Sequence, residues 1–177
     1  MNKSAEIALS AAGSGPRPAP LRRALLAWLP TLVWLVVLAL FSTDTFSAEH
    51  TGGILLKIIH AFYGGISQQR MEEMNFLVRK SAHFSGYGLL SALAFFSWRA
   101  TFPSVRPWSF RWVALALALT LAAASLDEFH QSFVPSRTSS PWDVVLDMVG
   151  ALGFQFAIAL WIRLRKPQAL EANSFFR

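Results

Sequence analysis

The feature that most limits the fold of this 177-residue chain is a set of four apolar segments of about membrane-spanning length. They are residues 24–41, 81–98, 112–126 and 144–162. A helix needs roughly 20 predominantly apolar residues to cross a bilayer, and in lipid it must pair its own backbone polar groups. The third segment is short, but a helical pattern continues it to Gln131. The sequence therefore predicts an all-α fold, an integral membrane bundle of four transmembrane helices.

Composition supports a lipid environment and argues against two other classes of protein. The chain is 54% apolar and 15% charged, which leaves too little polar surface to cover a water-soluble globule of this length. The net charge of +6 comes from basic residues that punctuate apolar segments instead of forming a run, so nucleic acid is not an expected partner. Cysteine is absent, which excludes disulfides and thiolate metal sites.

The distribution of basic residues predicts that both termini are cytoplasmic. Of the 16 lysines and arginines, eleven then lie in cytoplasmic segments and five in outer ones, and basic residues resist translocation. Residues 1–23 are rich in glycine, proline and small residues and are expected to form a disordered cytoplasmic tail. The first span is expected to stay uncleaved, since no convincing signal-peptide site follows it. The transmembrane domain is placed at 24–166 and a second cytoplasmic tail at 167–177.

The connection between the first two spans contains a further short apolar segment. Residues 54–63 are too few to cross a bilayer but apolar enough to lie in the headgroup plane, so they predict a short interfacial helix. A fifth span at this place is the alternative. The polar stretch 67–75 is expected to form a helical turn that leads into the second span.

Three groups of polar residues carry the chemistry, and the first opens the second span. Arg79, His83 and Tyr87 are spaced four residues apart, which places them on one helical face stepping from the outer interface into the membrane. Lys80 adjoins this face. In the simplest interpretation the two basic side chains extend to lipid headgroups, while His83 and Tyr87 hydrogen-bond to neighbouring backbone.

The second group closes the third span. Asp127, His130 and Gln131 share a helical face, and Glu128 points about a quarter turn away. A solvated helix end is the simplest interpretation, but acidic charge at a helix C-terminus opposes the macrodipole. We therefore expect a partner cation, for which Arg137 is the obvious candidate.

The third group opens the fourth span. Ser140 is the expected N-cap, with Pro141 at the first helical position and Asp143 at the positive end of the helix dipole. Asp147 lies one turn deeper, where an unpaired carboxylate costs roughly 2–4 kcal/mol near the bilayer centre. Its partner is predicted to be one of four residues, Arg79, His83, Tyr87 or Arg137.

These three stretches together resemble the VanZ-like family of small bacterial membrane proteins, named for a protein associated with teicoplanin resistance. The resemblance covers residues 30–162 and rests on the order and spacing of three motifs. The motifs are Arg79-Lys80-x-x-His83-Phe84-x-x-Tyr87, Asp127-Glu128-x-x-Gln131-x-Phe133-x-Pro135-x-Arg137 and Asp143-Val144-x-x-Asp147-x-x-Gly150. Gly86 departs from the family, in which an acid often precedes the tyrosine, and Asp147 stands where asparagine is frequent. The resemblance implies a multi-pass protein of the bacterial inner membrane, with no settled biochemical activity.

The leading functional hypothesis is an outward-facing polar cleft that binds or shields a membrane lipid or a lipid-linked cell-wall precursor. The family adds a link to glycopeptide resistance. Cations of the cleft would contact phosphate, and its carboxylates would orient them or bind sugar and peptide groups. The ligand-binding candidates are Arg79, Lys80, His83, Tyr87, Asp127, Glu128, Gln131, Arg137, Asp143 and Asp147. These residues are nearly balanced in charge, so a closed internal ion-pair network is the competing structural interpretation.

The rival functional hypothesis is a membrane-embedded hydrolase or transferase acting on a lipid-linked phosphate or sugar. Asp127, Glu128 and His83 are then the catalytic candidates, with His130 as a further base and Arg137 stabilising negative charge. Whether the chain is an enzyme stays open at this point.

Three further predictions complete the sequence interpretation. Oxygen ligands would suit a divalent cation, but their spacing specifies no metal site and no cofactor is expected. A proton-coupled transporter is less favoured because the ionisable residues gather at one end of the spans. Small residues such as Gly150 and Gly153 predict close helix packing, within one chain or in a homo-oligomer.

Overall fold

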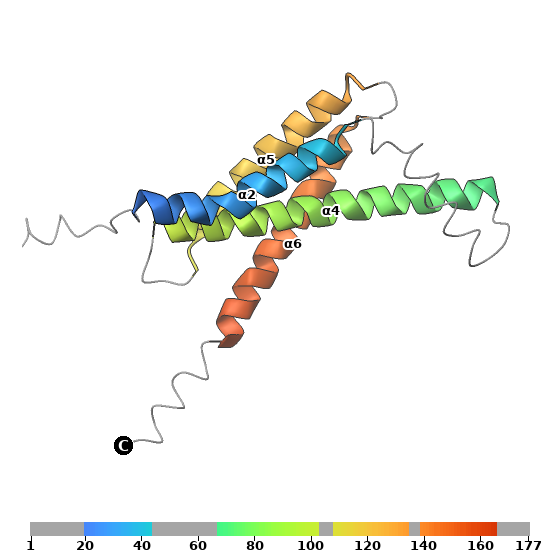
Figure 1. Cartoon of the computed structure of the whole chain (residues 1–177). Helices are drawn as coiled ribbons and strands as arrows, with labels where there is room; N and C mark the ends of the chain where they lie inside the picture. The colour runs from blue at the N-terminus through green and yellow to red at the C-terminus, as the bar shows by residue number, and fades with distance from the viewer. Residues whose placement is uncertain (1–19, 44–66, 103–107, 135–138, 166–177) are drawn as a thin grey trace, which may run out of the picture.

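The computed structural model describes residues 20–43, 67–102, 108–134 and 139–165, and these form four helices with no strand among them (Figure 1). The helices are α2 (Leu21–Phe41), α4 (Gln68–Thr101), α5 (Phe110–Gln131) and α6 (Pro141–Arg165). The all-α prediction is confirmed for this part of the chain. The expected interfacial helix, most of the expected N-terminal tail and the whole C-terminal tail lie outside the described residues.

Three of the four helices, α2, α5 and α6, are long and apolar enough to cross a membrane, in agreement with three of the predicted spans. α4 is less apolar, because the half of it predicted to span carries His83, Tyr87 and several serines. Its 34 residues correspond to about 50 Å of helix, which exceeds the thickness of a bilayer core.

The helix boundaries follow from local chemistry. α2 begins after Pro20, three residues earlier than predicted, so the paired arginines assigned to the tail are helical. α6 begins as predicted at Pro141, and the Trp142 amide donates a hydrogen bond to the Ser140 hydroxyl, 3.3 Å away. The polar stretch expected as a leading turn is continuous with α4, which starts at Gln68.

α4 is the central element of the bundle. It packs against α2 and α5 along its second half, and α6 crosses it (Figure 1). The contact between α4 and α6 is the most extensive in the described structure, and the first turns of α4 project beyond the other described helices. We call the polar end the region where α2 and α5 finish and α6 begins, with residues 79–87 of α4 between them.

The crossing of α4 and α6 is close because Gly150 has no side chain. A Cβ atom at this position would overlap the carbonyl group of Phe84 and come within 3.1 Å of its Cα atom. At Gly153 a Cβ atom would meet only the Phe84 ring, at 3.9 Å. The close packing predicted at Gly150 therefore occurs within one chain.

Polar side chains join the helices away from the polar end. Gln155 of α6 donates hydrogen bonds to the backbone and side-chain oxygens of Ser91 in α4, at 2.9 and 2.8 Å. The hydroxyl groups of Thr31 in α2 and Ser97 in α4 lie 2.9 Å apart. Lipid gives no hydrophobic drive to helix association, so such bonds and close packing hold the bundle together.

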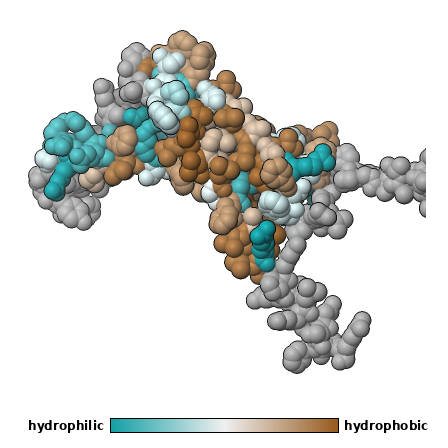
Figure 2. Space-filling model, turned by 180° about the vertical axis from the view of Figure 1, so that it is seen from behind, coloured by the Kyte–Doolittle hydropathy of each residue, from teal (hydrophilic) through white to brown (hydrophobic). Residues whose placement is uncertain are grey.

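The end of the bundle opposite the polar end is rich in aromatic rings. Trp28 and Trp98 meet edge to face with centroids 4.8 Å apart, and Phe102 stacks between Trp98 and Trp112. Apolar residues cover the middle of the molecule and hydrophilic ones gather toward its extremities, as Figure 2 shows for one side. This distribution is typical of a bundle surrounded by lipid.

Candidate functional site

The polar face of α4 lines a cavity at the polar end. Arg79, His83 and Tyr87 all border this cavity of about 220 Å³, and the His83 and Tyr87 rings stack with centroids 6.1 Å apart. Their spacing of four residues thus brings the three side chains to one face, as predicted. The other lining residues are Leu38, Phe41, Ser42, Val78, Ala82, Asp127 and Gln131. We call this space the first cavity.

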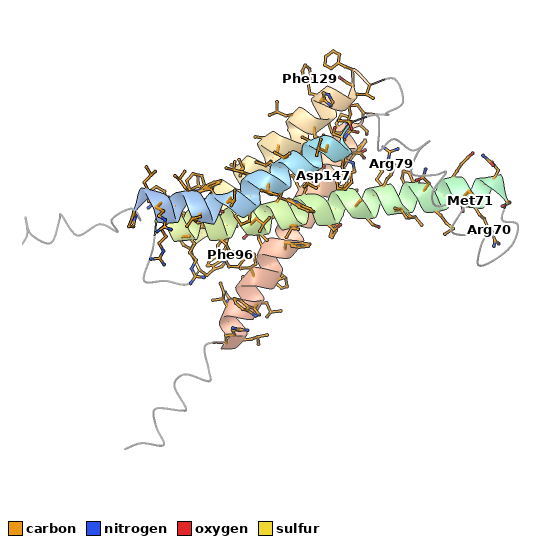
Figure 3. All side chains as sticks on the ribbon, viewed as in Figure 1. Arg70, Met71, Arg79, Phe96, Phe129 and Asp147 are labelled. Atoms are coloured by element: carbon orange, nitrogen blue, oxygen red, sulfur yellow. The ribbon has the colours of Figure 1, made fainter. Side chains whose placement is uncertain are left out.

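Asp147 is the most deeply buried carboxylate among the described residues, and it faces His83. It is 0% exposed, and its Oδ1 atom lies 3.4 Å from Nδ1 of His83. This contact lacks hydrogen-bond geometry, and neither carboxylate oxygen of Asp147 accepts a hydrogen bond from another described residue. Of the predicted partners of Asp147 that the structure describes, namely Arg79, His83 and Tyr87, His83 forms the ion pair with it. Figure 3 shows Asp147 near the crossing of α6 and α4.

Lys80 and Asp143 form an ion pair between α4 and α6. The Asp143 side chain is buried, whereas Lys80 keeps 28% of its side-chain surface exposed. The Lys80 ammonium group also lies over the ring of Phe76, 5.3 Å from the centroid. Asp143 therefore lies in the first turn of α6, as predicted, and pairs with a lysine of α4, so that the charges of Lys80 and Asp143 neutralise each other.

Glu128 joins the end of α5 to the start of α6. Its carboxylate accepts a hydrogen bond from the Ser140 amide at 2.9 Å, and its backbone carbonyl accepts one from the Ser139 hydroxyl at 2.9 Å. Amide groups at a helix N-terminus carry partial positive charge. The start of α6 thus gives Glu128 a partner with partial positive charge, and the predicted cation, Arg137, lies outside the described residues.

Asp127 and His130 occupy the wall that α5 contributes to the site. Asp127 accepts a hydrogen bond from the side-chain amide of Gln131 at 2.9 Å, and Gln131 is 1% exposed. His130 turns toward α2, where its Nδ1 atom lies 3.5 Å from the hydroxyl oxygen of Ser42. Among the described residues, Asp127 has no lysine or arginine nitrogen within 4 Å. Its oxygens therefore face the first cavity without a cation partner from the described helices.

Arg79 lies between two cavities and contacts no carboxylate of the described structure. Its Nε atom is buried without a hydrogen-bond partner, and Figure 3 shows the side chain on α4 at the polar end. A second cavity of about 620 Å³ lies on its other side. This second cavity is also lined by Phe76, Lys80, His83, Ser140, Trp142, Asp143 and Leu146. A guanidinium group with unused donors at two cavities is suited to binding an anion.

The described side chains thus form a partly satisfied network and not a closed one. Lys80 is neutralised by Asp143, while Arg79 is left without a carboxylate. In the ranges that the structure covers, no three His, Asp or Glu side chains come together as a group able to hold a metal ion. Arg137, expected in the same site, lies outside the described residues.

Two contributions to the site were missed by the sequence interpretation. Phe41 and Ser42 of α2 line the first cavity, and Ser42 is buried. The signal for them was weak, a pair of hydroxyl residues at the end of an apolar segment. Trp142 lines the second cavity and is 77% exposed. An aromatic residue next to the expected helix start was the signal in that case.

A comparison with known proteins places these observations in a family. A family model described as VanZ/LLP1 matches residues 26–163, a range that holds nearly all of the four helices and all three motifs. No curated protein and no solved structure matches the chain. The motif residues of α4, α5 and α6 that the structure describes meet at the polar end. Since the match covers well over half of the sequence, the chain belongs to the VanZ/LLP1 family.

Proposed function

We propose that α4 crosses the membrane with α2, α5 and α6, and that the polar end faces outward from a bacterial inner membrane with both termini cytoplasmic. α4 packs against each of the other three helices, and its residues Ser91 and Ser97 are buried between them. These two serines therefore lower the hydropathy of α4 without contacting lipid. The excess of basic residues in the segments assigned to the cytoplasm supports the orientation.

We propose that the polar end binds the phosphate-bearing headgroup of a membrane lipid or of a lipid-linked cell-wall precursor. The observation that carries this function is the state of Arg79, which borders two cavities, has a buried Nε atom without a partner and contacts no described carboxylate. Guanidinium groups bind phosphate through parallel charge-assisted hydrogen bonds. Without a bound anion, the buried Nε–H donor of Arg79 would have no acceptor, and an unsatisfied buried donor costs free energy.

The other charged residues support this role by holding the donors in place. Asp143 neutralises Lys80, and Asp147 faces His83, so Arg79 provides the uncompensated positive charge of the described site. On the opposite wall, Asp127 presents oxygen atoms to the first cavity. These oxygens would accept hydrogen bonds from hydroxyl or amine groups attached to the phosphate, as in a sugar or peptide headgroup.

The apolar rim of the cavities favours an amphiphile over a free anion. Phe41 and Val78 border the first cavity, while Phe76 and Trp142 border the second. Aromatic residues are common at the level of lipid headgroups, where one part of the ring is in hydrocarbon and another in water. A phosphate that arrives with its hydrocarbon chain in the bilayer would meet Arg79 from the membrane side.

The exchange of Arg79 for glutamine tests this function. Purified protein in nanodiscs is titrated with hexadecyl phosphate, a single-chain lipid with a phosphate headgroup. Arg79→Gln removes charge-assisted bonds worth about 1.5–3 kcal/mol and is expected to weaken binding roughly tenfold to a hundredfold. The matched control is Arg70→Gln, because Arg70 is exposed on the same helix and lines neither cavity (Figure 3). Equal binding by folded Arg79→Gln and wild-type protein would contradict the proposal.

A cellular assay addresses the link to cell-wall chemistry. Where the ligand is a cell-wall precursor, expression of the wild type in a teicoplanin-susceptible bacterium is expected to change susceptibility, and Arg79→Gln is expected to abolish the change. Arg137→Gln is expected to act in the same direction, since its motif adjoins the start of α6. A wild-type protein without effect would separate lipid binding from antibiotic resistance.

A second function is favoured by the pair formed by His83 and Asp147 beside the first cavity. A carboxylate next to one imidazole nitrogen can orient the ring so that its other nitrogen acts as a base. The protein would then be a hydrolase or transferase of a lipid-linked phosphate or sugar, with Arg79 stabilising negative charge and Asp127 as the acid. Release of phosphate from hexadecyl phosphate, lost in His83→Gln while binding persists, would establish this function. Binding without turnover, with and without Mg²⁺, would count against it.

A further inference from the structure

A groove separates α2 from α5 on the surface of α4. Both helices pack on α4 but make almost no contact with each other, which leaves a space of about 480 Å³ between them. Leu35 and Ala39 line it from α2, while Leu119, Ala122 and Leu126 line it from α5. The groove is therefore apolar along most of its length. It stays open partly because α5 presents alanine at this level and not a larger residue.

The groove is continuous with the candidate phosphate site. Ser42, Tyr87 and Asp127 line both the groove and the first cavity, which Arg79 also borders. Ser42 directly follows α2, and His130 lies in the last turn of α5, so the polar residues of the groove gather at the polar end. The groove thus has a polar mouth beside the anion site and an apolar body that extends toward the middle of the bundle.

We propose that this groove holds one hydrocarbon chain of the lipid whose phosphate contacts Arg79. The inference rests on the proposed phosphate-binding function and specifies its ligand, a phosphate-bearing lipid with at least one long, slender chain. Charge and shape both point to an amphiphile: the mouth opens into the first cavity, which Arg79 borders, and the walls of the groove carry leucine and alanine. A short-chain anchor would leave the body of the groove empty.

The groove would act mainly by orienting its ligand. A chain that enters it comes from lipid that is already apolar, so the gain is limited to van der Waals contacts with the walls. A chain lying between α2 and α5 would hold the phosphate at the level of Ser42, where the first cavity begins. The expected effect of the groove on affinity is therefore modest, and it should depend on chain length.

Substitutions that fill the groove provide the test. Ala39→Phe and Ala122→Phe place a ring in it from opposite walls, and both alanines are exposed, so neither ring enters the packed core. The matched control is Ala114→Phe, at an exposed alanine of α5 outside the groove. Hexadecyl phosphate and butyl phosphate are titrated onto each variant in nanodiscs. Because each compound is compared between variants, its partition into the bilayer cancels.

Both filling variants are expected to weaken hexadecyl phosphate binding roughly three- to tenfold and to leave butyl phosphate binding within about twofold of the wild type. Arg79→Gln should weaken the binding of both compounds. Unchanged hexadecyl phosphate binding in both filling variants, or equal losses for the two compounds, would overturn the groove and leave the phosphate site standing. A failure of Arg79→Gln to weaken either compound would instead overturn the proposed function.

A measurement of the oligomeric state tests the other possible occupant of the groove, a second copy of this chain. The mass of the protein in nanodiscs, measured by light scattering, should be the same for the wild type and for both filling variants. A dimeric wild type that Ala39→Phe and Ala122→Phe convert to a monomer would assign the groove to a contact between copies, and the inference would be wrong.

Discussion

Replacement of Gly150 with alanine is the sharpest test of how the bundle holds its site together. The new Cβ atom would overlap the carbonyl group of Phe84 and lie 2.9 Å from its carbonyl carbon. A backbone group cannot swing aside as a flexible side chain can, so α4 and α6 must separate at this point. His83 and Asp147, each within one turn of the contact, would move apart with the helices.

Two opposing effects set the expected magnitude. Alanine is favoured over glycine inside a helix by about 1 kcal/mol, whereas overpacking of a tight contact costs typically 1–3 kcal/mol. Since the obstacle at Gly150 is backbone, the upper part of the second range applies, and the free energy of unfolding should fall by about 1–2 kcal/mol. Gly153→Ala is the matched control, because its Cβ atom would make only an ordinary contact with the Phe84 ring at 3.9 Å. That variant should gain up to about 1 kcal/mol.

Unfolding in mixed micelles by titration with SDS, followed by circular dichroism, measures both free energies on one scale. Gly150→Ala and Gly153→Ala are expected to differ by about 1–3 kcal/mol, with opposite signs relative to the wild type. Titration with hexadecyl phosphate adds a second readout, in which Gly150→Ala loses affinity and Gly153→Ala keeps it. If Gly150→Ala is as stable as Gly153→Ala, α4 and α6 do not touch there and the reasoning is refuted.

Three further substitutions probe single interactions in the same unfolding assay. Lys80→Met leaves the buried carboxylate of Asp143 without its cation and should lower the free energy of unfolding by about 1–3 kcal/mol. A second exchange, Asp143→Asn, should restore most of this loss, whereas additive losses would mean that the two residues do not interact. Glu128→Ala removes the acceptor for the Ser140 amide and should lower the free energy of unfolding by about 0.5–2 kcal/mol. The Ser140 amide should then exchange its hydrogen faster, and an unchanged exchange rate would contradict the hydrogen bond. Gln155→Leu removes two buried hydrogen bonds to α4 and should cost about 0.6–2 kcal/mol, whereas a gain in stability would show that packing alone holds this contact.

Helix positions can largely be predicted from this sequence because lipid permits few solutions for long apolar segments. α2, α5 and α6 begin and end within a few residues of the predicted spans. The first part of α4, residues 68–78, was not predicted as part of the span because it is polar, and hydropathy detects only the apolar portion of a helix. Its glutamine, glutamate, methionine and arginine residues are strong helix formers, and they provide the signal that hydropathy lacks.

The residues of the site were easier to predict than their partners. Spacing along one helix determines which side chains share a face, so the polar face of α4 followed from the sequence. Pairs between helices depend on the point where the helices cross, which apolar periodicity does not specify. Gly150 sets that point at Phe84, the neighbour of His83, and this is why His83 is the candidate that meets Asp147. The hydrogen bond from the Ser140 amide to Glu128 escaped prediction for the same reason.

The two positions at which the chain departs from the motifs it resembles, Gly86 and Asp147, both lie at contacts between helices. Gly86 stands where an acid is frequent, and it lets α2 approach α4: the Trp34 indole donates to the Gly86 carbonyl at 2.9 Å, and a Cβ atom there would lie 3.1 Å from Leu38. A carboxylate at this position would point into α2 and hold it away. Asp147, where asparagine is frequent, brings negative charge to His83 from α6 instead. Asp147 thus lies beside His83 while α2 packs closely on α4 at Gly86, and Leu38 of α2 lines both the first cavity and the groove.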